Sequence, residues 1–168
     1  MSELNDYTAS WGSPLKISTG LGTLVLLGVL PVSAGTFGRA PLWITALVTL
    51  LPLVVLGGST LFTVRGYRLS EKELLILRLG FTTRIPLRKL TTAKFAPEAC
   101  DKSIRTLGNG GLFAFTGWYK NDTLGSYEMY ATDLSRTVVL RFSRRTIVIT
   151  PDQPEEFVRD VARQLKSE

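Results

Sequence analysis

The strongest candidate for chemistry is a segment in the second half of the chain that combines glycines with cations. Glycines can present successive backbone N–H groups to an anion, and nearby cations can fix it. The spacing matches neither a P-loop nor a dinucleotide fingerprint, because Gly-Lys-Ser/Thr is missing and the order Gly-x-Gly-x-x-Gly is not met. The segment predicts either an anion or headgroup site or a bulged, flexible loop. Its candidate ligand-binding residues are Lys102, Arg105, Gly108, Gly110, Gly111 and Lys120.

Catalytic and metal chemistry has little support in the sequence. The chain contains no histidine, which excludes Ser-His and Cys-His catalysis and imidazole-ligated metals. Ser103 beside Lys102 is a local nucleophile–base pair, but adjacent residues on a strand point to opposite faces. Glu98 and Asp101 offer two carboxylates and no third metal ligand at a recognisable spacing. We therefore expect no enzyme activity, no catalytic residue, no metal and no cofactor, and we expect Cys100 to be inert.

Two charge-free segments dominate the first 64 residues. There are 22 uncharged residues between Lys16 and Arg39, and another 25 between Arg39 and Arg65. Each segment is long enough to cross a hydrocarbon core of about 30 Å as a helix. The predicted organisation is an N-terminal tail over residues 1–16, a two-helix transmembrane hairpin over 17–64, with spans Ile17–Phe37 and Leu42–Val64, and a soluble domain over 65–168.

Two local features refine the predicted hairpin. Pro52 lies in the middle of the second span, where it removes a backbone hydrogen bond and should kink the helix. Small residues spaced four apart let helix backbones approach closely in a membrane. We therefore expect contact between the spans through the pairs Ser18/Gly22 and Thr45/Thr49.

The distribution of charge predicts the orientation of the hairpin. Charges cancel over residues 1–64, so the net charge of +6 lies on residues 65–168. The connecting loop carries only Arg39, whereas the second span is followed by Arg65, Arg68, Lys72 and Arg78. The positive-inside rule then predicts a multi-pass protein of the inner (plasma) membrane with a cytoplasmic C-terminal domain. A competing interpretation, in which residues 1–34 are a signal peptide cleaved after Val32-Ser33-Ala34, stays open.

The soluble part is predicted to be mainly β. Short segments rich in β-branched and aromatic residues alternate with polar turns. Pro86 predicts that its strand lies at an edge or at a bulge. The expected strands are Tyr67–Ser70 and Glu73–Leu79, which form a hairpin, and then Thr83–Leu87, Thr91–Phe95, Leu112–Tyr119, Tyr127–Thr132, Thr137–Phe142 and Thr146–Thr150.

The C-terminal segment carries a clear helix signal. Asp152 as N-cap, with Glu155 three residues later and Pro154 in the first turn, forms a capping box. The following apolar residues fall on one helical face, which must be buried against the domain. They are Phe157, Val158, Val161, Ala162 and Leu165.

Over about residues 64–165 the sequence resembles the bacterial PH-domain (pleckstrin-homology-like) proteins, in particular membrane-anchored members with a transmembrane hairpin before the domain. The resemblance is carried by Gly66-Tyr67, Arg84-Ile85-Pro86-Leu87, the stretch 110–119, Leu124-Gly125 with Tyr130-Ala131-Thr132-Asp133, and the stretch 147–157. It implies a membrane helical hairpin plus a PH-like split barrel of about seven strands with a C-terminal α-helix.

The resemblance also implies a scaffold for contact with proteins or lipids. In eukaryotic PH domains, basic residues around the first hairpin usually hold a phosphoinositide, whereas the turn here, Ser70-Glu71-Lys72-Glu73, is net acidic. We expect a membrane-anchored binding or adaptor protein whose partners are the lipid bilayer, anionic lipid headgroups or an unknown protein, and no nucleic acid. The alternative is an accessory subunit of a membrane complex that assembles through the hairpin.

Overall fold

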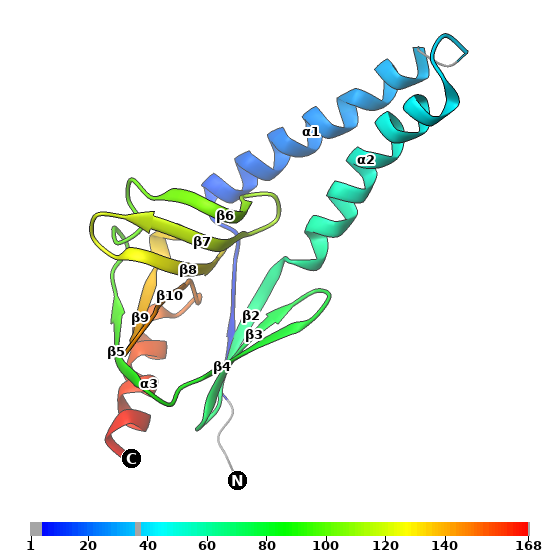
Figure 1. The fold of residues 1–168 in the computed structure, drawn as a ribbon. Helices are drawn as coiled ribbons and strands as arrows, with labels where there is room; N and C mark the ends of the chain where they lie inside the picture. The colour runs from blue at the N-terminus through cyan, green and yellow to red at the C-terminus, as the bar shows by residue number, and fades with distance from the viewer. Residues whose placement is uncertain (1–4, 36–37, 168) are drawn as a thin grey trace.

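The computed structural model describes residues 5–35 and 38–167. It consists of two long helices, two β-sheets and a C-terminal helix (Figure 1). The helices are α1, Ser13–Gly35, α2, Leu42–Leu61, and α3, Pro154–Ser167, and a single 3₁₀ turn, η1, covers Leu134–Arg136. The predicted order of two apolar helices, a mainly β domain and a final helix is confirmed.

Helices α1 and α2 run side by side and project away from the β domain (Figure 1). Both are long and apolar enough, by length and composition, to cross a membrane, and most of their side chains are exposed. Helix α1 begins at Ser13, ahead of the predicted Ile17, and Leu15 is fully buried. Helix α2 continues through Pro52 and ends at Leu61. The predicted end of the first span, at Phe37, lies outside the described residues.

The small residues of α1 have a role different from the predicted helix–helix contact. The Ser18 hydroxyl donates to the carbonyl oxygen of Gly111 at 2.7 Å. A Cβ added to Gly22 would lie 3.2 Å from the side chain of Leu112. These residues therefore pack the first turns of α1 against the β domain. On α2, Thr45 is buried and its carbonyl accepts a bond from the Thr49 hydroxyl at 2.8 Å.

The first sheet is antiparallel and has four strands in the order β1-β2-β3-β4. These strands are β1, Asn5–Thr8, β2, Val64–Leu69, β3, Glu73–Arg78, and β4, Thr82–Pro86. Strand β4 is an edge strand, as Pro86 predicts. Strand β1 lies in the segment expected to be a tail, so residues 5–8 are part of the β domain.

The second sheet has six strands in the order β5-β9-β10-β8-β7-β6, and the one parallel pair in it is β8–β10. These strands are β5, Leu90–Phe95, β6, Ile104–Gly110, β7, Phe115–Asn121, β8, Gly125–Ala131, β9, Val138–Phe142, and β10, Thr146–Ile149. The described residues thus form ten strands where about seven were expected. Strand β6 occupies the glycine-containing segment.

The main core lies between the two sheets and α3. It is formed by inward residues of both sheets and by the predicted apolar face of α3 except Ala162, which is exposed. Its buried members include Tyr67, Leu74, Leu140, Phe157 and Val161. A second cluster covers the other face of the six-stranded sheet and includes Cys100. Burial raises the pKa of the Cys100 thiol, which favours its inert neutral form.

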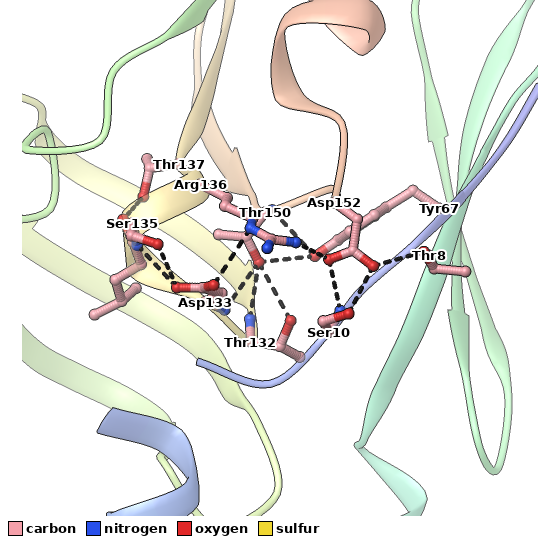
Figure 2. A network of polar contacts seen from close by, with 11 residues as sticks. Thr8, Ser10, Tyr67, Thr132, Asp133, Ser135, Arg136, Thr137, Thr150 and Asp152 are labelled. Carbon is pink, nitrogen blue, oxygen red and sulfur yellow. Dashed lines mark hydrogen bonds and ion pairs between the residues drawn. The ribbon is translucent and has the colours of Figure 1, made fainter. Parts of the chain in front are cut away.

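The predicted capping role of Asp152 is wrong. Helix α3 begins at Pro154, and the Asp152 carboxylate faces the N-terminal segment instead. It accepts bonds from the Thr8 hydroxyl at 2.6 Å and from the Ser10 backbone N–H at 3.0 Å, and it pairs with the Arg136 guanidinium (Figure 2). Asp152 therefore connects β1 to the turn that contains η1.

A buried hydroxyl beside Asp152 joins the two sheets. Tyr67 of β2 donates to the backbone oxygen of Tyr130 at 2.6 Å. It also accepts from the N–H of Thr150 at 3.1 Å (Figure 2). The N–H of Gly12, just before α1, donates to the Thr132 oxygen at 3.0 Å, and a Cβ at Gly12 would overlap Asp133. The start of α1 and strand β2, which follows α2, are thus both hydrogen-bonded to the six-stranded sheet and the segments next to it.

Candidate binding groove at the helix–domain junction

A groove of about 700 Å³ lies between the end of α2 and the β6–β7 hairpin. Its volume is in the range of small-molecule sites, about 300–1,000 Å³. Its walls come from α2, β3, β6, β7, β8 and the β6–β7 turn. The lining residues are Val54, Val55, Gly58, Ser59, Phe62, Arg78, Arg105, Gly108, Asn109, Leu112, Thr116, Gly117 and Tyr130.

Arg78 is a charged residue in the lining of this groove. Its guanidinium carbon lies 4.7 Å from the ring centre of Phe81, 5.0 Å from that of Tyr130 and 5.8 Å from that of Phe62. Such cation–π contacts stabilise a cation without neutralising it. The Nε atom is buried without a hydrogen-bond partner, and within the described ranges no carboxylate forms an ion pair with Arg78.

Burial lowers the pKa of the Arg78 guanidinium from its usual value. An arginine nevertheless stays protonated in proteins, so Arg78 brings a full positive charge into a largely apolar groove. A half-buried charge without a counter-ion is costly, and an anion in the groove would offset that cost. The groove therefore has the electrostatics of an anion site.

The β3–β4 turn fixes Arg78 at the level of the last turn of α2. Arg78 is the final residue of β3, opposite Val64 of β2. The N–H of Leu79 donates to the Thr63 oxygen and that of Gly80 to the Leu61 oxygen, both at 3.1 Å. A Cβ at Gly80 would lie 3.0 Å from Leu61. Glycine at this position lets the turn approach the helix end closely.

Two glycines shape the opposite wall. Gly108 of β6 and Gly117 of β7 are paired in register, with φ angles of 114° and 127°. A Cβ on either residue would overlap the backbone of the facing strand. Both the positive φ and the close strand contact require glycine here. The hairpin wall is consequently bare of side chains at these two positions.

The structure brings some of the six predicted ligand residues together and separates others. Arg105 and Gly108 line the groove, and Arg105 also lines, with Gly110, a second cavity of about 330 Å³ near Cys100. Lys102 lies in the turn before β6, and Lys120 is exposed on β7 opposite Ile104. Neither lysine lines the groove.

Gly111 lies beside α1 rather than in the groove. Its carbonyl accepts bonds from the hydroxyls of Ser18 and Thr19, at 2.7 and 3.0 Å. Its N–H donates to the side-chain oxygen of Asn109 at 3.2 Å and to the Ala114 oxygen at 3.2 Å. These backbone groups serve the packing of the β6–β7 turn against α1.

Sequence reasoning missed Arg78 as a site residue and assigned it only to the charge bias after the second span. A signal was present in the alternation Leu74, Ile76, Arg78, because every second residue of a strand points to the same face. Leu74 and Ile76 are fully buried. A cation at the next inward position is a buried polar residue in need of a partner.

The hydroxyl of Ser103 is held by hydrogen bonds within the β domain. It accepts bonds from the Tyr127 hydroxyl at 2.6 Å and from the Asn121 side-chain amide at 3.0 Å. Lys102 precedes it at a φ of 54° and is exposed. Across residues 5–35 and 38–167, no group of three or more His, Cys, Asp or Glu side chains is placed to hold a metal ion.

Comparison with known proteins agrees with the fold described above. A family model described as "Bacterial PH domain" matches residues 65–165, which is more than half of the chain. No curated protein and no solved structure matches the chain. Two sheets closed by a C-terminal helix fit a PH-like fold, and two apolar helices precede it. This chain belongs to the bacterial PH-domain family.

Proposed function

We propose that this protein is a membrane-anchored PH-like adaptor without catalytic activity, whose groove recognises an anionic group of a protein partner or of a lipid. The observation that carries the proposal is the unpaired Arg78 in the groove beside α2. PH-like domains are typically binding modules, and the hydrogen bonds accepted by Ser103 give its hydroxyl a packing role.

In this proposal α1 and α2 cross the inner membrane and the β domain lies on the cytoplasmic side. Support comes from the length and composition of both helices. Support for the orientation comes from Arg65 and Arg68 after α2, against Arg39 alone in the connection. We also propose that residues 1–34 stay in the mature protein, because removing them would take away β1 and the buried Leu15.

Photocrosslinking in native membranes tests whether the groove binds anything. Ser59 lines the groove, so a photoreactive residue at position 59 of the full-length chain should give an adduct. The adduct should disappear when Arg78→Gln is added and remain when Arg65→Gln is added, because Arg65 is an exposed cation outside the groove. Asp122, exposed in the β7–β8 turn, is the position at which no adduct is expected.

The mass of the adduct separates the two ligand classes. A shift of a few hundred daltons indicates a lipid, and a shift of protein size indicates a protein partner. Crosslinking at position 59 that is indifferent to Arg78→Gln would overturn the proposal, because contact with bulk lipid does not depend on that arginine.

A further inference from the structure

We propose that the groove holds the headgroup phosphate of an anionic phospholipid taken from the bilayer around α2, with Arg78 as its anchor. This inference rests on the proposed function and names its ligand. It places the lipid site between the helix end and the β6–β7 hairpin. The acidic first hairpin turn, residues 70–73, has no part in it.

The β3–β4 turn places Arg78 level with the end of α2. The β3–β4 turn exposes large apolar side chains, with Leu79 54% and Phe81 44% accessible. Its hydrogen bonds to Leu61 and Thr63 hold it level with the end of α2. If α2 crosses the bilayer, these side chains rest at the membrane interface, where apolar and aromatic groups are favoured. Arg78, next to Leu79 in this turn, is then at headgroup depth.

The charge of the groove favours an anion. Its lining contains Arg78 and Arg105 and no aspartate or glutamate, and the Arg105 guanidinium lies against Gly110 of the second cavity. The buried Nε of Arg78 has no hydrogen-bond partner. Guanidinium groups match phosphate oxygens in geometry and form stronger hydrogen bonds than neutral donors. A phosphate beside the Arg78 guanidinium would thus supply the missing negative charge.

One wall of the groove is apolar and is formed by α2. Val54, Val55 and Gly58 of α2 line the groove, and Val54 is 66% accessible. This wall continues along the exposed apolar surface of α2, which faces lipid when the helix crosses a membrane. The groove therefore suits a ligand that joins an anionic head to an apolar tail. A free phosphate or an acidic peptide lacks that tail.

Binding can be measured by native mass spectrometry of the full-length protein in detergent, with added phosphatidylglycerol or phosphatidylcholine. The wild type should retain phosphatidylglycerol about tenfold more strongly. Arg78→Gln should abolish this preference. Arg65→Gln removes an equal charge near the same helix end and should leave the preference unchanged. Thermal unfolding of each variant shows whether the fold is retained.

A second pair of variants tests the groove without touching either arginine. Gly58 lines the groove, whereas Gly57, its neighbour in α2, does not. A Cβ at either position meets no atom within 4 Å, so neither backbone position excludes a side chain. Gly58→Leu should lower phosphatidylglycerol retention about tenfold by filling the groove, and Gly57→Leu should retain it.

Three outcomes would overturn the lipid assignment. They are equal retention of both lipids by the wild type, unchanged preference in both Arg78→Gln and Gly58→Leu, and displacement of the lipid by millimolar inorganic phosphate, which would indicate a site for a free anion. A protein-sized, Arg78-dependent adduct at position 59 combined with equal lipid retention would reject the lipid and leave the proposed function intact. Absence of any Arg78-dependent adduct would reject the binding function itself.

Discussion

At the scale of single residues, Arg78 and Asp152 are charged groups that differ in whether their charge has a partner. Arg78 is held among aromatic rings without a carboxylate partner in the described part of the chain. Asp152 is surrounded by donors from Thr8, Ser10 and Arg136 (Figure 2). A satisfied charge stabilises the fold, whereas an unsatisfied one is available to a ligand.

The stabilisation of the fold by Asp152 should depend on pH. Burial raises the pKa of Asp152, but the bonds from Thr8 and Ser10 and the charge of Arg136 outweigh it and lower the pKa from its ordinary 3.8. The carboxylate therefore stabilises the fold above that value, and the effect is lost as the pH falls through the folded-state pKa. Asp152→Asn should cost about 2 kcal/mol at pH 7 and less at pH 2, because the stabilisation declines as the pH falls below 3.8.

Chemical denaturation of the full-length chain in detergent at both pH values measures this difference. Asp122→Asn, at an exposed turn position, is the matched control and should change stability little at either pH. A loss for Asp152→Asn that is equal at pH 7 and pH 2 would show that ionisation of this group does not matter.

At the scale of elements, β1 makes the segment before α1 part of the β domain. It pairs with β2 next to the start of the PH-like region, so the chain enters α1 from the β domain and returns to it after α2. Hydrogen bonds from Ser18 and Thr19 to Gly111 fix the first turns of α1 to the β6–β7 turn. Both helices are thus held by the domain, which keeps the walls of the groove in place.

Tyr7 provides the test of β1. Its ring is 5% exposed and packs edge-on against Phe157 with a centroid distance of 5.1 Å. Tyr7→Ala should lower the free energy of unfolding by about 3–5 kcal/mol. Tyr7→Phe keeps the ring and loses only the 2.6 Å bond to Asp160, so it should cost about 1 kcal/mol. Denaturation of the full-length chain, followed by near-UV circular dichroism, distinguishes the two. Equal losses would contradict the packing role of the ring.

At the scale of the whole molecule, the pair of helices α1 and α2 extends away from the β domain, and the two parts meet at one junction (Figure 1). The groove lies at that junction. In the proposed topology, the β domain would meet the membrane with the β3–β4 turn and the β6–β7 hairpin, the elements that flank the groove. A position at the bilayer would also raise the local ligand concentration, so that a weak intrinsic affinity suffices.

Cysteine labelling tests the proposed topology in a Cys100→Ala background. Ser143 is exposed in the β9–β10 turn, and Ala40 lies in the connection between α1 and α2. A membrane-impermeant maleimide should label Ala40→Cys in intact spheroplasts and Ser143→Cys only after the membrane is opened. The reverse pattern would place the domain outside the cytoplasm, and labelling of both from one side would contradict a spanning hairpin.

The sequence by itself determined the features that depend on local pattern. The apolar lengths of α1 and α2, the alternation in most strands and the amphipathic face of α3 with Phe157 and Val161 all follow from residue type and period. Two of the predicted ligand residues, Arg105 and Gly108, line the candidate groove, and their role as ligand residues stays a prediction. Glycine next to a cation is a local signal, so it could be found without the fold.

Only the tertiary structure decided what depends on contacts between distant segments. Strand β1 is four residues long and finds its partner about 60 positions away, at Gly66 to Leu69. Strand β6 is rich in polar residues and glycine, and its pairing with β7 defines it. The groove exists because α2, β3 and the β6–β7 hairpin meet there. The charge of Arg78 was visible in the sequence, but its lack of a partner is a property of the assembled fold.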